Sequence, residues 1–461
     1  MKKFNVAVIG AGAGGLTIGY TAKGFNKTVV LIDKNRPGGE CTFGGCVPSK
    51  AFINIANHIY KAKEYINIVP NTEDILKKVR EVVESVYEAK SIEVLKKDGI
   101  DYINGFCKFI DKNTLEVEGE IIKADKIFIA TGSSPKIPPI NGLDKIDYLT
   151  NENIFYKDKL PKSIIVLGGG SIGVELSQAM NRIGIEVYLI EKNPYIMYKE
   201  EGELSKSLEE ILRKEGVNIY TSCNAKNIEK YKDGIKLTIE KNNKEENIYS
   251  ENILIAVGRV PNIKGLELEK VNIDYDLKGI KVNEYLETSL KGVYAVGDVV
   301  GPYLFSHMAN VQGIAAVKNA SLPIKEKMDY SKVAWCTLSE PEFGRAGLRE
   351  DEARKIYGDS IRVYVEDYKD LDRAKFKNNP KGRAKVICDK KGYILGASVL
   401  GDRAGEIISE IQTLKSLGIN LKKLTKVIHP YPSYSEILVK ISKKLYVDTL
   451  LDNPFIKAFK R

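Results

Sequence analysis

Cysteine, histidine and tryptophan are scarce in this sequence of 461 residues, which contains six, three and one of them. Six cysteines are too few for a disulfide scaffold at this length, and the usage indicates a reducing compartment, so we expect a cytoplasmic protein. Four of the six are isolated and are expected to be buried thiols: Cys107, Cys223, Cys336 and Cys388. With three histidines and no second cysteine pair, a zinc site lacks a full set of ligands, and no metal site is predicted.

Long apolar runs and long basic runs are also lacking. No apolar run approaches the roughly 18 residues of a membrane-spanning helix, and the start MKKFNVAVIG leads directly into a strand-like run, so neither a membrane span nor a signal peptide is expected. The net charge is +10, yet no three Lys or Arg residues are consecutive. Basic residues alternate with acidic ones, which favours a solvated surface over a nucleic-acid interface. A mild positive field favours anionic small molecules such as phosphate-bearing cofactors.

Two glycine-rich turns mark an internal repeat. The stretches FNVAVIGAGAGG (4–15) and IIVLGGGSIG (164–173) each carry a G-x-G-x-x-G motif after a strand-like run. A second strand-like run ends 23 residues after the first glycine, in Asp33 and in Glu191. Such glycines let the backbone approach a pyrophosphate at a helix N-terminus, and the acid accepts hydrogen bonds from the adenosine ribose. Two dinucleotide sites are therefore predicted, with Gly10, Gly12 and Gly15 in the first and Gly168, Gly170 and Gly173 in the second.

The repeat extends beyond the glycine motifs. DKIFIATGSSP (125–135) parallels ENILIAVGRVP (251–261), and the segments 100–124 and 217–250 before them read as short strands of an antiparallel excursion. A helical pattern follows the first motif, and its apolar positions are expected to pack in the core: Ile75, Val79, Val82, Val83 and Val86. Later, GVYAVGDVVG (292–301) predicts a buried strand and a turn carrying Asp298, and from about residue 330 strands and helices alternate in an α+β pattern.

The stretch GGECTFGGCVPSK, from Gly38 to Lys50, holds the one close cysteine pair, Cys41 and Cys46. The pair can be a structural disulfide, half of a metal site or a redox dithiol. Five residues along a regular helix rise about 7.5 Å, whereas a disulfide needs Cα atoms within roughly 7 Å. The Gly44-Gly45 step between the cysteines permits the necessary distortion. A reducing compartment favours a catalytic pair, and a strained, accessible disulfide is easily reduced.

These segments together resemble the pyridine nucleotide–disulfide oxidoreductases, the flavoprotein family of dihydrolipoamide dehydrogenase, glutathione reductase and mercuric reductase. The resemblance rests on GAGAGG, GGECTFGGCVPSK, ATGSSP, GGGSIGVE, VGRVPN, YAVGDVV and HPYPSYSE. It implies an α/β fold with two tandem Rossmann-like domains, for FAD and NAD, and a C-terminal α+β dimerisation domain. The expected boundaries are 1–148 for the FAD domain, 149–265 for the NAD(P) domain, 266–328 for a central domain and 329–461 for the dimerisation domain.

The resemblance also implies roles for single residues. FAD would lie at the first glycine motif with Asp33, with Asp298 at the ribityl chain and Thr131 and Gly132 nearby. The nicotinamide nucleotide would lie at the second motif, with Gly258 close to it. Cys46 would face the flavin and Cys41 the substrate, while Lys50 would sit by the flavin N5 and pair with Glu175. A cation there favours the reduced flavin and the Cys46 thiolate.

Glu191 bears on the choice between NADH and NADPH. A carboxylate at this position binds the ribose 2′-hydroxyl and repels a 2′-phosphate, and no arginine lies nearby in the sequence, although Lys192 is adjacent. We expect NAD(H) to be preferred over NADP(H).

The sequence departs from the family at the C-terminal motif. Dihydrolipoamide dehydrogenase and glutathione reductase carry a catalytic His directly before Pro-Thr, with a Glu five residues later. Aligning that Glu with Glu436 places Tyr431 at the position of the His, and His429 lies two residues earlier. The general acid is thus Tyr431, a shifted His429, or absent. Mercuric reductases carry Tyr there, but also a C-terminal cysteine pair, whereas this sequence ends DNPFIKAFKR.

The resulting hypothesis is an FAD-dependent NAD(P)H oxidoreductase that exchanges electrons with a small disulfide, dithiol or lipoyl-type substrate, as dihydrolipoamide dehydrogenase does. It would act as a homodimer in which Tyr431 and Glu436 serve the active site of the other subunit. One alternative is a mercuric-reductase-like reductase of metal ions or other electron acceptors. Another is a flavin-bearing electron-transfer subunit of a larger complex.

Overall fold

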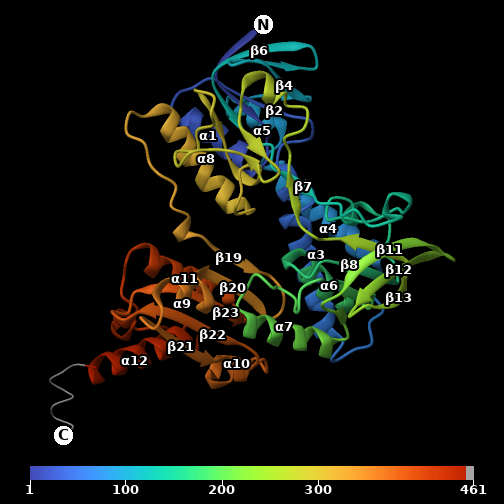
Figure 1. The fold of residues 1–461 in the computed structure, drawn as a ribbon, viewed down its shortest axis with the longest axis vertical. Coiled ribbons are helices and arrows are strands. Elements are labelled where there is room, and N and C mark those ends of the chain that lie inside the picture. The colour runs from blue at the N-terminus through green and yellow to red at the C-terminus, as the bar shows by residue number, and fades with distance from the viewer. Residues whose placement is uncertain (453–461) are drawn as a thin grey trace. The chain divides into compact units, whose positions relative to one another are not determined.

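A computed structural model describes residues 1–452, which form two compact units. The first unit contains residues 1–162 and 251–329, and the second contains 163–250 and the chain from residue 330 onward. The predicted domain boundaries at 148, 265 and 328 remain predictions, and residues 453–461 of the expected last domain lie outside the described residues. Figure 1 shows the course of the chain.

The first unit is built on a sheet of mainly parallel strands. Its elements are β1 (Lys2–Ile9), α1 (Ala13–Gly24), β2 (Val29–Asp33), α2 (Gly39–Phe43), α3 (Cys46–Ala62), α4 (Thr72–Glu88), α5 (Ile92–Lys97), β3 (Asp101–Asn104), β4 (Cys107–Asp111), β5 (Thr114–Val117), β6 (Glu120–Ile129), β7 (Ser133–Pro135), β14 (Asn252–Ile255), β15 (Arg259–Pro261), β16 (Tyr275–Asp276), β17 (Gly279–Ile280), β18 (Val293–Ala295) and α8 (Ser306–Ser321). Strands β3, β2, β1, β6 and β18 lie side by side in that order and run parallel.

Alternate residues of these strands face two separate cores. Val6, Val8 and Leu31 pack with α1 and α8 on one face, whereas Ala7 and Ile9 pack on the other face with β4, β5 and the segment that precedes β18. Both faces of the parallel strands are therefore covered, and their sequences read as continuous apolar runs for that reason. Helices α1 and α8 lie against each other in Figure 1.

In each repeat, the segment predicted to be antiparallel includes one strand that belongs instead to the parallel sheet. Strands β4 and β5 pair antiparallel with the start of β6, but β3 at the beginning of the segment 100–124 runs parallel to β2 in the main sheet. In the second repeat, Asn218–Tyr220 likewise runs parallel to the strand before it. A short strand after a helical crossover returns parallel to its predecessor, and length alone does not distinguish it from a hairpin strand.

Helices α3 and α4 pack together beside the cysteine segment. Ile75, Val79 and Val83 of α4 are buried as predicted, but Val82 is exposed and Val86 only half-buried. Leu76 takes the core position instead. An apolar stripe wider than the contact surface of a helix leaves its outer members exposed, and these two valines line a groove described below.

The second unit begins with the second repeat and ends with an antiparallel sheet. Its elements are β8 (Ser163–Leu167), α6 (Ser171–Arg182), β9 (Glu186–Ile190), α7 (Gly202–Glu215), β10 (Asn218–Tyr220), β11 (Asn224–Tyr231), β12 (Gly234–Lys241), β13 (Lys244–Ser250), β19 (Ala334–Thr337), β20 (Glu342–Gly347), α9 (Glu350–Tyr357), β21 (Ile361–Asp367), α10 (Asp372–Phe376), β22 (Arg383–Asp389), β23 (Ile394–Gly401), α11 (Ala404–Ser416) and α12 (Glu436–Leu451). Strands β8, β9 and β10 are parallel, and β11, β12 and β13 form an antiparallel sheet.

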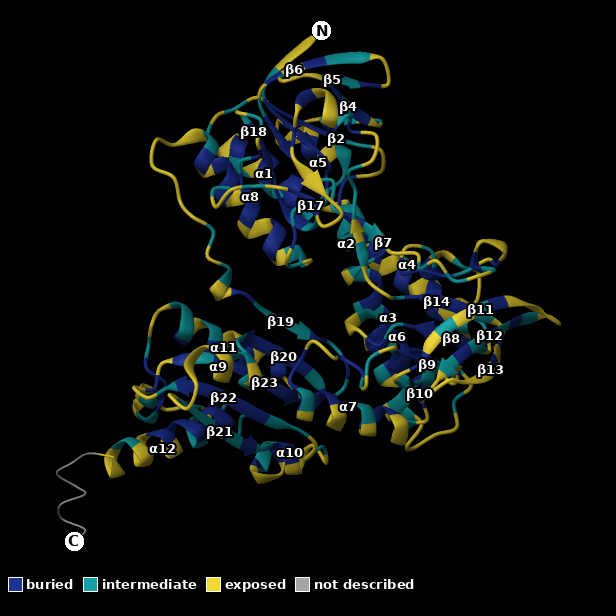
Figure 2. Cartoon of the chain, in the orientation of Figure 1, coloured by how far each residue is buried: buried dark blue, intermediate teal, exposed yellow. Residues whose placement is uncertain are grey.

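The antiparallel sheet near the C-terminus has the order β19-β20-β23-β22-β21. Its central strands β20, β22 and β23 are almost entirely buried, as Figure 2 shows, because α11 and α12 contribute to a single apolar core with them. Two Rossmann-like α/β repeats and this α+β portion confirm the predicted fold class.

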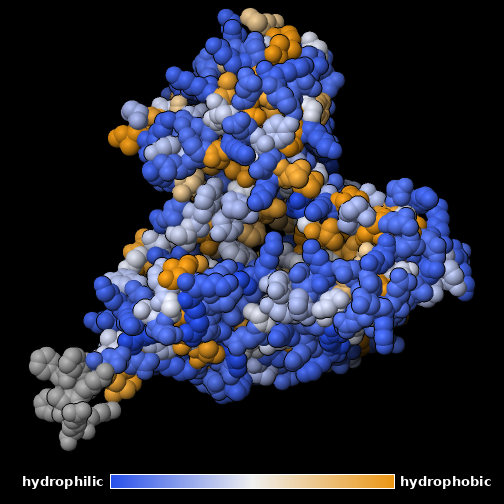
Figure 3. Space-filling view, in the orientation of Figure 1, coloured by the Kyte–Doolittle hydropathy of each residue, from blue (hydrophilic) through white to orange (hydrophobic). Residues whose placement is uncertain are grey.

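The surface is mostly hydrophilic, with apolar residues in separate groups on the face drawn in Figure 3. Among the described residues, no helix is both long and apolar enough to cross a membrane. Cys107, Cys223 and Cys388 are buried as expected, but Cys336 is only half-buried, because it lies on the edge strand β19.

Candidate active site

The first glycine motif forms the turn between β1 and α1. Gly10 has a φ of +104°, which favours glycine, and a Cβ on Gly15 would lie 1.8 Å from the carbonyl oxygen of Gly10. Gly12 is the N-cap of α1, so the first turn of the helix presents backbone N–H groups without a capping side chain. The turn therefore has the close backbone packing and the open helix N-terminus that suit a pyrophosphate.

The second motif repeats this geometry between β8 and α6. Gly168 has a φ of +111°, a Cβ on Gly173 would lie 1.9 Å from the carbonyl oxygen of Gly168, and Gly170 is the N-cap of α6. The same glycine positions thus meet the same steric demand in both units.

The two acids support their glycine turns in the same way. Asp33 Oδ2 accepts a hydrogen bond from Ala11 N at 2.7 Å, and Glu191 Oε2 accepts one from Gly169 N at 2.7 Å. The other carboxylate oxygen accepts from a backbone N–H two residues later, of Asn35 in one case and of Asn193 in the other. The sequence D/E-K-N recurs at both turns, but only its acid was predicted to belong to the site, and the asparagine that donates to it was not. Burial raises the pKa of Asp33.

The remaining residues predicted to bind FAD follow neighbouring strand ends. Gly10, Thr131 and Asp298 follow the carboxyl ends of β1, β6 and β18, which are adjacent parallel strands. Asn262 holds the Thr131–Gly132 turn, since its side chain donates to the Thr131 carbonyl at 3.0 Å and its backbone N–H donates to the Gly132 carbonyl at 3.0 Å. Ligands of open parallel sheets bind at this edge, so the residues present fit the cofactor.

Two glycines interrupt the cysteine segment, as the sequence predicts. Helix α2 ends at Phe43 and α3 begins at Cys46, and the backbone N–H groups of Gly44 and Gly45 both donate to the Glu40 carbonyl, at 2.8 and 2.6 Å. A Cβ on Gly45 would lie only 3.3 Å from the Cα of Cys41. The chain therefore folds back closely enough to bring the two cysteines together.

Cys41 and Cys46 are free thiols, and hydrogen bonding between them shifts their pKa values in opposite directions. The bond from Cys46 is the main cause that lowers the pKa of Cys41 to about 6, despite burial, and Ser306 and Lys90 lower it further. The same bond raises the pKa of Cys46 well above its usual value, with burial adding to the effect and Lys50 opposing it. The two thiols thus titrate as one pair that loses its first proton below neutral pH.

Lys90 and Ser306 were not predicted from the sequence. Lys90, just after α4, donates from Nζ to Thr42 Oγ1 at 3.2 Å, which places its charge beside the residue that follows Cys41. Ser306, the first residue of α8, has its hydroxyl 3.8 Å from Cys46 Sγ. Neither lies near the pair in sequence, and no local pattern distinguishes them from other lysines and serines.

Glu40 and Arg259 form a second unpredicted contact, at the residue that precedes Cys41. Arg259 begins β15, which pairs antiparallel with β7. The two strands belong to ATGSSP and AVGRVP, the corresponding segments of the two sequence repeats, so these segments contact each other. Its guanidinium forms a forked ion pair with the Glu40 carboxylate. Gly258, directly before it, has a φ of +124° and accepts a hydrogen bond from Lys136 N.

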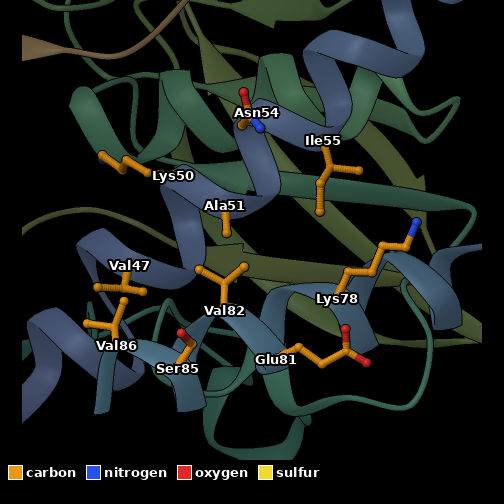
Figure 4. A pocket seen from close by; sticks show the side chains of 10 residues that line it. All are labelled: Val47, Lys50, Ala51, Asn54, Ile55, Lys78, Glu81, Val82, Ser85 and Val86. Carbon is orange, nitrogen blue, oxygen red and sulfur yellow. The ribbon is translucent and has the colours of Figure 1, made fainter. Parts of the chain in front are cut away.

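An open groove of ≈ 820 Å³ lies between α3 and α4. Figure 4 shows Val47 and Ala51 of α3 pointing toward Val86 and Val82 of α4, with Lys50 on the same helix as the first two. Val47 directly follows Cys46, so the groove starts beside the dithiol. Its lining is Val47, Lys50, Ala51, Asn54, Ile55, Lys78, Glu81, Val82, Ser85 and Val86.

The predicted acid–base residues lie in the second unit. His429 Nε2 lies 2.9 Å from Glu410 Oε1 of α11, so the carboxylate partner of this histidine is a residue that the sequence did not suggest. The Tyr431 hydroxyl donates to Asp372 Oδ2 at 2.9 Å, and this bond raises the tyrosine pKa. Tyr431 is 68% exposed, as suits a residue that meets another surface.

Two predicted glutamates in this unit are largely withdrawn from solvent. Glu436 is the first residue of α12, and its Oε2 is buried without a hydrogen-bond partner among residues 1–452. Glu175 on α6 is 4% exposed and accepts a hydrogen bond from Leu338 N at 2.6 Å. Lys50 belongs to the first unit and Glu175 to the second, and their pairing remains a prediction.

Comparisons with known proteins agree on one family. The sequence profile described as "Pyridine nucleotide-disulphide oxidoreductase" matches residues 4–321, and that of the dimerisation domain of the same family matches residues 333–441. Dihydrolipoyl dehydrogenase of Thermus scotoductus is 33% identical over 457 residues, which cover 97% of this chain and 98% of the relative. Mercuric reductase of Bacillus cereus is 29% identical over 442 residues, covering 94% of this chain and 70% of the relative.

A solved structure agrees over nearly the whole chain. The Cu(II) complex of the HOCl-induced flavoprotein disulfide reductase RclA from Escherichia coli matches with a TM-score of 0.88 at 26% identity, and the match covers 96% of this chain and all of that one.

Proposed function

Because the chain belongs to the pyridine nucleotide–disulphide oxidoreductase family, whose members are FAD-dependent oxidoreductases, we propose that Cys41 and Cys46 carry electrons between its cofactors and a substrate. The carrying observation is the turn at Gly44 and Gly45, which folds the chain back onto Cys41 and brings Cys41 and Cys46 together as free thiols, in a segment that begins beside the first glycine turn. Gly38 N donates to the Ala11 carbonyl at 2.8 Å and holds that segment to the turn.

FAD, when bound, supplies the carrier that relays two electrons between the nicotinamide nucleotide and the thiols. In this proposal, Gly10, Gly12 and Gly15 hold its pyrophosphate, Asp33 binds its ribose, and Asp298 and the Thr131–Gly132 turn lie along the rest of the molecule. Gly168, Gly170, Gly173, Glu191 and Gly258 hold the nicotinamide nucleotide. The buried Glu191 carboxylate supports NADH over NADPH, because a 2′-phosphate would bring negative charge against it.

The thiol chemistry follows from the pKa of the pair. Reduction of the Cys41–Cys46 disulfide at pH 7 takes up two electrons and one proton and leaves one thiol and one thiolate. A Cys41 thiolate attacks one sulfur of a disulfide substrate, which releases the first substrate thiol. Cys46 then attacks Cys41, re-forms the enzyme disulfide and releases the second thiol, and one further proton completes the two products. Dithiol oxidation runs through the same steps in reverse.

The proton donor in this proposal is the C-terminal turn of the partner subunit in a homodimer, which the dimerisation domain supports. His429 Nε2 lies 2.9 Å from Glu410 Oε1, a histidine–carboxylate contact that suits an acid–base group, whereas the bond to Asp372 raises the pKa of Tyr431 and makes it a poor base. We therefore assign the acid–base role to His429. A pH–rate profile for disulfide reduction whose alkaline limb disappears in His429→Ala but not in Tyr431→Phe supports this assignment, and the opposite pattern contradicts it.

A lipoyl-type dithiol is the favoured substrate, and the groove between α3 and α4 supports this choice. Its valines and alanine offer an apolar wall for an aliphatic chain, and it begins at Val47, one residue after the thiol that pairs with the substrate-facing Cys41. In Val82→Asp, the KM for dihydrolipoamide should rise at least tenfold, while reduction of a small quinone by NADH stays unchanged. Val69→Asp, at an 89% exposed position outside the groove, is the control. An unchanged KM in Val82→Asp refutes the groove as substrate site.

A mercuric-reductase-like activity is the second candidate, and Tyr431 is the observation that favours it. Steady-state assays with dihydrolipoamide, small disulfides and Hg(II), each with NADH and NADPH, discriminate between the two. Turnover of dihydrolipoamide that is lost in Cys41→Ser and Cys46→Ser supports the first candidate. Turnover of Hg(II) alone supports the second, and bound FAD without turnover of any of these substrates supports an electron-transfer subunit. A cytoplasmic location remains part of the proposal.

A further inference from the structure

Four side chains from four segments of the first unit connect the dithiol to the edge of the parallel sheet. Arg259 of β15 forms the ion pair with Glu40 of α2, and its Nε donates to Ser133 Oγ of β7 at 2.7 Å. The Ser133 hydroxyl in turn donates to Asp298 Oδ2 at 2.6 Å. The chain Glu40–Arg259–Ser133–Asp298 therefore begins at the residue before Cys41 and ends at the residue proposed to lie along FAD.

Glu40 is fixed in place from several directions. Its Oε1 accepts from Asn151 Nδ2 at 2.5 Å, and the same amide group donates to the Gly44 carbonyl at 3.0 Å. Its own carbonyl accepts from Gly44 and Gly45, which define the turn between the cysteines. The side chain of Arg259 is 10% exposed and that of Glu40 26% exposed, so water screens the pair incompletely.

We propose that the ion pair of Glu40 and Arg259, whose Nε also lies 3.7 Å from Asp298 Oδ2, tunes the reduction potential of the Cys41–Cys46 dithiol through the charges that it places beside the cysteine segment. This inference rests on the proposed function, because it concerns the same dithiol. Reduction converts the disulfide and two electrons, with one proton, into a thiol and a thiolate, so any net charge nearby changes the stability of the reduced form. Glu40 and Arg259 act on this equilibrium as positioning residues and not as catalytic ones.

Removing the carboxylate and removing the guanidinium, each in a separate variant, should shift the reduction potential of the dithiol in opposite directions. Glu40→Gln removes one negative charge while Arg259 keeps Asp298 as a partner, so the thiolate is stabilised and the potential rises. Arg259→Met removes the positive charge shared by Glu40 and Asp298, so the thiolate is destabilised and the potential falls. The double variant should lie near the wild type. A purely structural role would shift both single variants in the same direction and the double variant further still, and it therefore predicts a different pattern.

The experiment equilibrates the purified holoenzyme with a thiol–disulfide redox buffer and counts alkylated Cys41 and Cys46 by mass spectrometry, without NADH or substrate. Each single variant should change the equilibrium constant by about threefold, which corresponds to about 14 mV for a two-electron couple. The measurement is made at pH 8, so that Glu40 stays ionised in Arg259→Met although burial raises its pKa.

Two controls keep the outcomes separate. Glu116 of β5 forms an ion pair with Lys108 of β4, and its side chain is 26% exposed, as that of Glu40 is. Glu116→Gln should leave the reduction potential of the dithiol unchanged. Arg259→Lys keeps the charge but not the fork, and it should stay closer to the wild type than Arg259→Met does. If Cys41 and Cys46 never form a disulfide in the redox buffer, the proposed function fails. If they do form one but the two single variants shift alike or not at all, only the present inference is refuted.

Discussion

The lowered pKa of Cys41 predicts a specific change in reactivity when Cys46 is replaced. The hydrogen bond from Cys46 is the largest cause of that pKa, which is about 6 in the reduced enzyme. In Cys46→Ala this bond is lost, and the pKa of Cys41 should rise toward the ordinary value of about 8.5. The thiolate is the reactive form and predominates above the pKa, so the pH at which alkylation reaches half its maximum should move upward by as much as about 2.5 units.

The size of the effect depends on the pH of the assay. At pH 5.5 a thiol of pKa 6 is about 24% ionised, and one of pKa 8.5 about 0.1%, a ratio of about 240. The thiolate of the variant is more basic and therefore the better nucleophile. With a Brønsted slope of 0.4–0.5, its higher reactivity offsets about 13-fold of this difference in ionisation. Alkylation of Cys41 should therefore slow by about 13-fold to 24-fold at pH 5.5 in Cys46→Ala, while the difference at pH 7 is only about twofold.

The assay follows iodoacetamide labelling of the reduced protein by mass spectrometry from pH 5 to pH 9. Cys107 and Cys388 serve as internal controls, because burial raises the pKa of each to about 12 and they should stay unlabelled. Equal midpoints for Cys41 in wild type and Cys46→Ala, or a wild-type midpoint above pH 8, would refute the hydrogen bond as the cause of its reactivity.

Three further substitutions probe the cofactor turn, the dithiol and the second unit. Gly15→Ala should yield protein without the visible absorbance of FAD, since its Cβ would overlap a backbone carbonyl, whereas Gly24→Ala, with open space around it, should retain the cofactor; retention in both refutes the steric argument. Lys90→Met should raise the alkylation midpoint of Cys41 by less than Cys46→Ala does, and an unchanged midpoint removes Lys90 from the site. Arg182→Met, which leaves two glutamates without their buried partner, should lower the free energy of unfolding by about 3–5 kcal/mol in chemical denaturation; a loss under 1 kcal/mol contradicts this.

The glycine turns were predictable from sequence because their demand is local. A Cβ on Gly15 or Gly173 meets a carbonyl only five residues away in the chain, so the motif records the contact directly. The acids at the strand ends follow for the same reason, since the parallel strand that carries each one must end beside the turn. The interruption at Gly44 and Gly45 was predictable too, from the reach of a disulfide alone.

Contacts between distant segments were not predictable in this way. Glu40 and Arg259 are separated by 219 residues, and no periodicity relates them. Glu410 belongs to a helix whose register against the C-terminal turn decides that it, and not Glu436, contacts His429. Val82 looked like a core residue because periodicity identifies an apolar stripe but not the width of the surface that covers it.

The central claim is that electrons from the nicotinamide nucleotide reach Cys41 and Cys46. The most direct measurement adds one equivalent of NADH to the oxidised holoenzyme without oxygen, quenches with an alkylating reagent and maps the labelled cysteines by mass spectrometry. The account predicts label at Cys41 and Cys46 that was absent before NADH, with the other four cysteines unchanged. Loss of NADH and reduction of the flavin without new label at either cysteine would contradict it.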